Sequence, residues 1–285
     1  MTGFVTRFAP SPTGYLHLGH AFSALVVNAA ARKADGVMAL RVEDIDQTRC
    51  RPEFEQAIYD DLSWLCLEWP KPVRRQSDHF DDYRAALQVL IDKRLVYRCF
   101  KTRKEIADEI ARAPHLARSG PEGPQYSGAA LPPDEEAARV EAGEAYAWRL
   151  SMAAARDHLG TNYKLLSFCE ETKRGAVERP ATPEIFGDAV IARKDAGTSY
   201  HLASVHDDAL QGVTHVIRGE DLAAAAHLHC LLQRLLGYLT PVYRHHRLIT
   251  GDDGQRLAKR NRSATLHALR EAGVDPSEVR AQLGF

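Results

Sequence analysis

The sequence lacks the features of several broad classes of protein. No run of apolar residues approaches the roughly 20 that a membrane-spanning helix needs, and the first residues, MTGFVTRFAPSP, contain no apolar stretch of a signal peptide. The overall charge is nearly balanced, with 37 basic and 38 acidic residues and a formal net charge of -1. These absences argue against a membrane or secreted protein, and any nucleic-acid partner would have to be bound by a local basic patch.

Cysteine is sparse and unpatterned. The cysteines are odd in number and form no Cys-x-x-Cys or Cys-x-Cys pair; they are Cys50, Cys66, Cys99, Cys169 and Cys230. This pattern predicts reduced thiols in a cytoplasmic protein rather than a disulfide framework. There is no internal repeat, and we expect a monomer.

The first part of the sequence alternates strand-like and helix-like segments. These lie at residues 4–9, 18–33, 37–42, 53–67 and 79–93. Pro52 stands just before the second helical segment, where the first turn of a helix tolerates proline. Such alternation is typical of a parallel α/β sheet.

The composition changes near residue 97. Residues 113–133 are dense in proline and glycine, which predicts a loop inside a larger insertion. Further on we expect strands at 145–150, 189–193, 213–217 and 247–250, and helices at 221–235 and 266–272. Asp221 is the expected cap of the longer helix.

Residues 7–20 (RFAPSPTGYLHLGH) form the clearest motif. Pro10 and Pro12 fix an extended turn after the first strand, and Gly14 lets the backbone approach a ligand closely. His17 and His20 stand three residues apart where a helix begins, so both lie on one face. Helix N-termini favour anions, and two imidazoles there can donate hydrogen bonds to phosphate oxygens. The motif therefore predicts a cradle for the phosphates of a nucleotide.

This segment resembles the HIGH motif of class I aminoacyl-tRNA synthetases, and specifically the glutamyl and glutaminyl branch. The second motif of that class, a lysine loop of KMSKS type, has a match in RLAKR, residues 256–260. The first and third positions of the usual motif, Lys and Ser, are Arg256 and Ala258 here. The resemblance implies that His17, His20 and Lys259 are catalytic, and that ATP is bound by Pro12, Gly14, His17, Gly19, His20 and Lys259. The resemblance also implies that the nucleotide is ATP and that Mg²⁺ accompanies its phosphates.

The predicted fold is accordingly α/β, a Rossmann-type parallel sheet of a class I synthetase catalytic domain, interrupted by an α+β insertion and followed by a short C-terminal tail. We expect the two halves of the catalytic domain at residues 1–96 and 183–245, and the insertion at 97–182. The lysine-loop region and helical tail would occupy 246–285.

Candidate residues for an acidic amino acid follow two predicted strands. Arg7 closes the first strand and Glu43, in RVEDID, ends the second, so both should lie at the carboxyl edge of the sheet, where such folds bind ligands. By resemblance, Glu43 binds the ammonium of glutamate and Arg218 its side-chain carboxylate. Tyr200 adds a hydrogen bond, and Arg7 and Ser11 also contact glutamate. Taken without the motif, RVEDID could be an exposed acidic turn and Arg218 a structural ion pair.

Glutamyl-tRNA synthetases carry a large C-terminal anticodon-binding region, whereas this sequence continues for only 26 residues after Lys259. It thereby resembles the glutamyl-queuosine tRNA(Asp) synthetases, which consist of the catalytic half. That resemblance implies activation of L-glutamate without tRNA and its transfer to queuosine at the wobble position of tRNA(Asp). RNA contacts from residues 244–247 and 260–262 are as plausible as a solvated basic surface.

The insertion departs from members that bind zinc through a Cys-x-Cys pair, a tyrosine and a later cysteine. Cys99 is present and Tyr126 matches the tyrosine, but no further cysteine occurs until Cys169. Since structural zinc normally has four good ligands, we expect none. The insertion would then be held by a core around Tyr97, Phe100, Tyr146 and Trp148.

Three alternatives remain open. A truncated enzyme could charge the 3′ end of tRNA(Glu) with the same chemistry. A nucleotidylyltransferase has similar histidine turns but needs no glutamate pocket. A synthetase-like RNA-binding module without catalysis would not need His17, His20 and Lys259.

Overall fold

The computed structural model describes residues 3–112, 118–249 and 265–285. Its first part alternates strands and helices as expected: β1 (Val5–Phe8), α1 (Leu18–Lys33), β2 (Val37–Val42), α2 (Pro52–Trp64), β3 (Arg74–Arg75) and α3 (Phe80–Asp92). The bounds of α1 and β2 are those predicted. A 3-10 turn, Gln76–His79, precedes α3.

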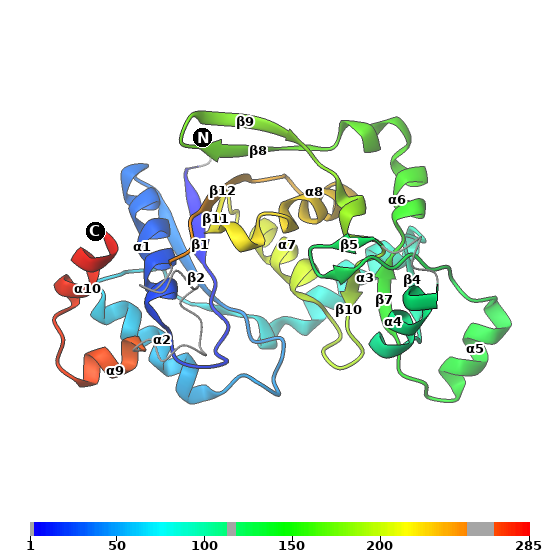
Figure 1. The fold of residues 1–285 in the computed structure, drawn as a ribbon, viewed down its shortest axis with the longest axis horizontal. Coiled ribbons are helices and arrows are strands. Elements are labelled where there is room, and N and C mark those ends of the chain that lie inside the picture. The colour runs from blue at the N-terminus through cyan, green and yellow to red at the C-terminus, as the bar shows by residue number, and fades with distance from the viewer. Residues whose placement is uncertain (1–2, 113–117, 250–264) are drawn as a thin grey trace.

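A parallel sheet forms the centre of the molecule (Figure 1). Strand β1 pairs with β2 and β2 pairs with β3, both in parallel. Strand β11 (His215–Gly219) pairs in parallel with β12 (Val242–His246). The two groups meet where the backbone N–H of Thr214 donates to the Val5 carbonyl oxygen at 2.9 Å. The predicted Rossmann-type architecture is therefore confirmed, and the reversal of strand order between β1 and β11 is where such sheets bind ligands.

The insertion contains a second, antiparallel sheet of order β10-β7-β4. Its strands are β4 (Val96–Cys99), β7 (Ala147–Leu150) and β10 (Val190–Ala192), and around them lie α4 (Arg103–Arg112), α5 (Pro133–Glu141), α6 (Met152–Leu159), and the short strands β5 (Ser119–Gly120) and β6 (Gly123–Pro124). The hairpin β8 (Ser167–Thr172) and β9 (Gly175–Pro180) extends the central sheet, because β8 lies parallel to β12. The division at residues 97 and 182 stays a prediction.

Two predicted elements of the second half were misplaced. The helix expected at 221–235 is α8 (Ala225–Leu236), because a 3-10 turn takes up Glu220–Leu222. Asp221 lies in that turn and is not the helix cap. No strand occurs at residues 247–249, because β12 precedes them and ends at His246; residue 250 lies outside the described residues.

Helix α7 (Tyr200–Leu210) was not predicted from the sequence. It is buried on most of its circumference, including the polar residues His201, Ser204, Asp207 and Asp208. A helix buried all round lacks the single apolar stripe that identifies a surface helix. The helix packs against α3 and α8, and its Asp208 contacts Arg7 of β1 and Arg41 of β2.

Two apolar cores support the central sheet. One is built from α1, α2 and the C-terminal helices α9 (Leu266–Glu271) and α10 (Pro276–Leu283), which lie beside α1 and α2 in Figure 1. The other joins α3, α7 and α8 to the sheet and to α6 of the insertion. Within the described part of the chain, no helix is both long and apolar enough to cross a membrane.

Candidate active site

A cavity of roughly 430 Å³ opens at the carboxyl ends of β1 and β11. Eight of the predicted site residues line it: Arg7, Ser11, His17, Gly19, His20, Glu43, Tyr200 and Arg218. Pro12 and Gly14 lie in the turn beside the cavity without lining it, and Lys259 lies outside the described residues. Residues predicted from segments about 200 residues apart in the sequence therefore line one cavity.

The two histidines organise the start of α1. His17 is the N-cap residue, and its Nδ1 accepts a hydrogen bond from the Gly19 N–H at 3.1 Å. His20 Nδ1 accepts in turn from the His17 N–H at 3.2 Å, so the pair forms a reciprocal capping box. Because both Nδ1 atoms accept, each neutral ring carries its proton on Nε2. The predicted phosphate donors are therefore held in one tautomer by the helix they cap.

Arg218 is a buried cation without an anionic partner in the part of the chain that the structure describes. It lies at the end of β11 and is only 4% exposed. Its Nη1 donates to the Tyr200 hydroxyl at 3.3 Å and lies 3.5 Å from His229 Nδ1, whereas Nε and Nη2 have no hydrogen-bond partner within the described ranges. Among the described residues it has no ion pair. Since an unpaired buried charge is costly, an anion bound in the cavity would stabilise this guanidinium.

Glu43 supplies the opposite charge on the same cavity. It follows β2, and its Oε1 accepts from Arg41 Nη2 at 3.1 Å. Arg41 and Glu43 are two residues apart along an extended segment, so both side chains point to the same face of the sheet. Burial raises the pKa of Glu43, although Arg41 and Arg7 oppose this shift. A carboxylate held in this way can bind an ammonium group.

Arg7 reaches the cavity through a buried ion-pair network that the sequence did not reveal. Asp208 Oδ1 accepts from Arg7 Nε at 3.0 Å and from Arg41 Nη1 at 2.7 Å. Asp207 binds the neighbouring Arg74, Gln76 and Tyr83. Asp208 thus holds Arg7 directly and Glu43 through Arg41. The alternation of RVEDID could have indicated that Arg41 shares the face of Glu43.

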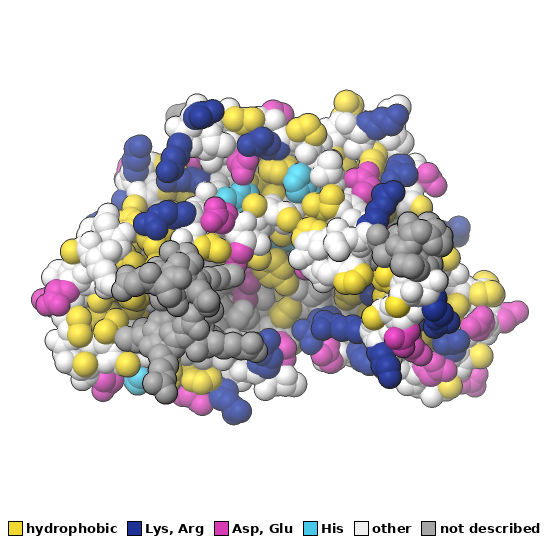
Figure 2. Space-filling view, viewed as in Figure 1, with side chains coloured by type: hydrophobic (Ala, Val, Ile, Leu, Met, Phe, Trp, Pro, Cys, Tyr) yellow, Lys and Arg dark blue, Asp and Glu magenta, His cyan; other side chains and the backbone are white. Residues whose placement is uncertain are grey.

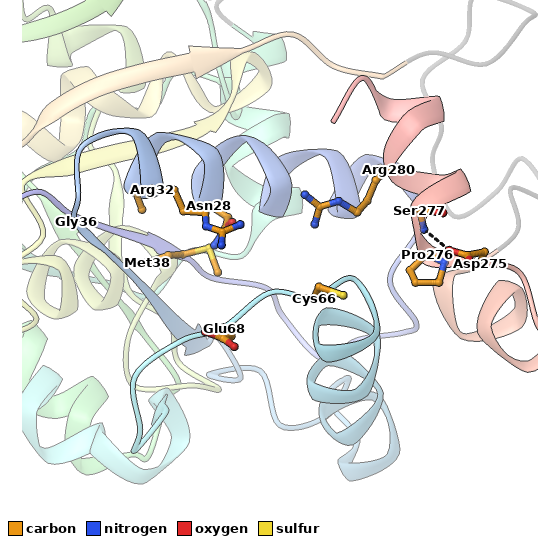
Figure 3. Close-up of a pocket in the computed structure, with 11 residues that line it drawn as sticks. Asn28, Arg32, Gly36, Met38, Cys66, Glu68, Asp275, Pro276, Ser277 and Arg280 are labelled. Carbon is orange, nitrogen blue, oxygen red and sulfur yellow. Dashed lines mark hydrogen bonds between the residues drawn. The ribbon is translucent and has the colours of Figure 1, made fainter.

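A second cavity, of about 670 Å³, lies at the other end of α1 (Figure 3). It is lined by Asn28 and Arg32 of α1, by Met38 and by Arg280 of α10. Gly36, just before β2, places it at the amino end of that strand. Although it is larger, it contains none of the predicted site residues that the structure describes, and it lies away from the edge where parallel sheets bind ligands.

The insertion packs around Cys99 and Tyr126. These two residues form a small buried core with Tyr97 and Ile106. The expected aromatic cluster lies partly exposed beside it, where Phe100 contacts Tyr146, and Arg98 lies over Tyr146 and Trp148. In the ranges that the structure describes, no three metal-binding side chains come together. The absence of zinc stays a prediction.

The residues suggested for RNA contact are partly engaged within the protein. His245 Nδ1 lies 2.9 Å from Glu170 Oε1, and His246 Nε2 lies 3.0 Å from the Ser23 hydroxyl. Arg244 is exposed, and Arg247 lies over the Phe22 ring. Figure 2 shows this view of the molecule hollowed between its two halves, with basic side chains spread over both. A basic RNA-binding surface therefore stays a hypothesis.

Comparison with known proteins agrees with this geometry. Residues 4–284 match the family described as "tRNA synthetases class I (E and Q), catalytic domain". The chain belongs to this family. It is therefore a ligase of the aminoacyl-tRNA synthetase type, and the resemblance found in its motifs is confirmed. Membership of this family argues against the nucleotidylyltransferase.

The curated relatives carry two kinds of name. A "Glutamyl-Q tRNA(Asp) synthetase" of Rhodobacter capsulatus is 46% identical over 99% of this chain and 100% of that protein. One of Symbiobacterium thermophilum with the same name is 38% identical over 98% of the chain and 85% of its own length. A "Glutamate--tRNA ligase 2" of Nitrosococcus oceani is also 38% identical, but the chain covers only 58% of it.

The fold has a solved counterpart. The glutamate-tRNA synthetase of Elizabethkingia anophelis superposes with a TM-score of 0.78 and 26% identity. The alignment covers 99% of this chain and 61% of that one. The described chain thus has the architecture of a glutamyl-type catalytic domain.

Proposed function

We propose that this protein activates L-glutamate with ATP, without tRNA, and transfers the glutamate to queuosine at the wobble position of tRNA(Asp). The observation that carries the choice of glutamate is Arg218, a buried guanidinium with two unsatisfied nitrogens and no carboxylate partner among the described residues. A substrate with a side-chain carboxylate satisfies it. The acceptor is supported by the names of the relatives that this chain matches over 85% or more of their length.

Each charged group of glutamate has a counterpart on the cavity wall. The side-chain carboxylate pairs with Arg218 and the ammonium with Glu43. Arg7 uses its Nε for Asp208, and its terminal nitrogens make no hydrogen bond with the described residues. They are placed to attract the α-carboxylate. Bidentate guanidinium groups at both ends select an amino acid with two carboxylates.

In the first step, an oxygen of the α-carboxylate attacks the α-phosphorus of ATP. The bond to the bridging oxygen of the β-phosphate breaks, and pyrophosphate leaves with the electron pair. His17 and His20, with their protons on Nε2, donate toward the charge that develops on the phosphates. Lys259 is proposed to add a cation at the same place. The site acts by positioning and by electrostatic stabilisation.

In the second step, a hydroxyl of the queuosine cyclopentenediol attacks the carbonyl carbon of the mixed anhydride. AMP is the leaving group, and the hydroxyl proton is released. Mg²⁺ would enter with ATP, bound through phosphate oxygens and water as it usually is, because the described residues contain no cluster of ligands for it. The monomeric state and cytoplasmic location expected from the sequence stay predictions.

Charging of the 3′ end of tRNA(Glu) is the second candidate, since a relative named glutamate--tRNA ligase 2 is 38% identical. Two measurements separate the possibilities. Glutamate-dependent exchange of pyrophosphate into ATP without tRNA is expected; its absence would contradict the first step. Radiolabelled glutamate should then appear in the anticodon fragment of nuclease-cut tRNA(Asp), and label found in the 3′ fragment would favour the second candidate.

A further inference from the structure

A chain of four side chains links Arg218 to the insertion. Arg218 Nη1 lies 3.5 Å from His229 Nδ1, His229 Nε2 lies 3.1 Å from His201 Nδ1, and His201 Nε2 lies 2.8 Å from Glu122 Oε1. The three inner residues are buried, whereas the Glu122 side chain is 60% exposed. The chain therefore runs from the floor of the cavity to the protein surface.

Both ends impose the same direction on its hydrogen bonds. A guanidinium can only donate, so His229 Nδ1 must accept and its proton must lie on Nε2. An ionised carboxylate can only accept, so His201 must donate from Nε2 and accept at Nδ1. The two requirements agree at the contact between the histidines, where His229 donates and His201 accepts. Burial, followed by the nearby charge of Arg218, holds the pKa of His229 well below its ordinary value, consistent with a neutral ring.

We propose that His229, His201 and Glu122 are positioning residues for glutamate recognition, which hold and orient Arg218 through this one-directional chain. The inference rests on the proposed function, in which Arg218 binds the side-chain carboxylate of glutamate. None of the three need touch the substrate, and each acts through its neighbour in the chain.

The arrangement explains how Arg218 can be kept in place and yet stay available. A carboxylate in direct contact would occupy the nitrogens that the substrate needs. Neutral His229 engages only Nη1 and leaves Nε and Nη2 unsatisfied. The negative charge of Glu122 polarises the chain from its far end, which strengthens each acceptor along it.

Glu122 ties the pocket to the insertion. It lies between β5 and β6, in a segment that is anchored to residues 185–188, which precede β10. Gln125 Nε2 donates to the Ile185 carbonyl at 2.8 Å, and the Gly128 N–H donates to Asp188 Oδ2 at 2.9 Å. The insertion thereby contributes to amino-acid affinity without lining the amino-acid site.

The test is the Glu122→Gln variant, which keeps an acceptor but removes the charge. In pyrophosphate exchange, the KM for glutamate should rise about 2–5-fold, because a charge-assisted hydrogen bond becomes a neutral one. The KM for ATP and kcat should stay within about 2-fold. The matched control is Glu141→Gln on α5, an exposed glutamate in the same insertion for which no ion pair is seen among the described residues; it should resemble the parent protein.

A second variant tests whether the chain acts as a unit. His201→Leu leaves the buried N–H of His229 unsatisfied, and the KM for glutamate should rise roughly 10-fold. Adding Glu122→Gln to His201→Leu should then not raise the KM for glutamate further, because the hydrogen-bond chain from Glu122 to Arg218 is already broken.

The outcomes separate this inference from the function on which it rests. Parent protein without glutamate-dependent exchange would overturn both. Exchange in the parent protein, with Glu122→Gln equal to its control or with equal rises in both KM values, would overturn the positioning chain alone. The same holds for fully additive effects in the double variant.

Discussion

Replacing Arg218 by methionine should stabilise the protein while it abolishes glutamate recognition. The buried guanidinium has no anionic partner among the described residues, and two of its nitrogens have no hydrogen-bond partner. Replacing even paired buried charges by apolar side chains often stabilises a protein by about 1–4 kcal/mol. Against this stands the loss of two long hydrogen-bond contacts, to Tyr200 and His229, and of the position of the guanidinium over the Tyr243 ring, each contributing about 1 kcal/mol or less.

The expected net gain is therefore about 1–3 kcal/mol of unfolding free energy. For a chain of this size it would raise Tm by roughly 2–8 °C. Glutamate at about 100 times its Kd should stabilise the parent protein by about 2.7 kcal/mol, and should not shift the Tm of the variant. Pyrophosphate exchange should fall about 100-fold or more in kcat/KM.

The matched control is Arg7→Met. Arg7 is about as buried as Arg218, but its Nε is paired with Asp208 at 3.0 Å. Removing one partner of a buried pair costs about 3–5 kcal/mol, so this variant should lose stability as well as glutamate binding. Thermal unfolding with and without glutamate measures both. An Arg218→Met protein that melts below the parent, or that glutamate still stabilises, would refute this account of Arg218.

Three further predictions follow from the same contacts. Asp208→Asn should lower the unfolding free energy by about 3 kcal/mol. Burial raises the pKa of Asp208, but the charges of Arg7 and Arg41 outweigh burial and hold that pKa below its ordinary value. Urea titrations should therefore show that the stability difference between the two proteins shrinks as the pH falls below about 4. His17→Asn and His17→Ala should both reduce kcat about 10²-fold or more, but only alanine, which cannot cap α1, should cost about 1 kcal/mol of stability. Because burial raises the pKa of Glu43, the KM for glutamate should begin to rise on acidification at a higher pH than for an ordinary glutamate, and Glu43→Gln should give a high, flat profile; a parallel rise in both proteins would contradict its role.

The sequence predicted best where strong local signals coincide. The bounds of α1 and β2 were predicted correctly because a turn precedes α1, the helix is rich in Ala and Leu, and an apolar strand follows it. Helix α7 was not predicted because it is buried on nearly all sides, so its sequence lacks the single apolar stripe of a surface helix. The β8–β9 hairpin was missed because β9 is exposed along its whole length, so neither face carries a buried apolar pattern.

The candidate site also divides into residues that local motifs predict and contacts that only the folded chain shows. Motifs located Arg7, Glu43 and the two histidines on one cavity, but they could not show the environment of Arg218. That environment is made by α7, α8 and the loop at Glu122, and their side chains meet only in the folded chain. The link between Arg7 and Asp208 spans 201 residues. Such contacts depend on tertiary packing, which no local pattern encodes.

The most direct measurement compares two preparations of tRNA(Asp), one with queuosine at the wobble position and one without it. With ATP and radiolabelled glutamate, the account predicts that only the queuosine-bearing tRNA becomes labelled. It also predicts that activation of glutamate proceeds at the same rate without any tRNA. Equal labelling of both preparations, or labelling of tRNA(Glu) alone, would contradict it.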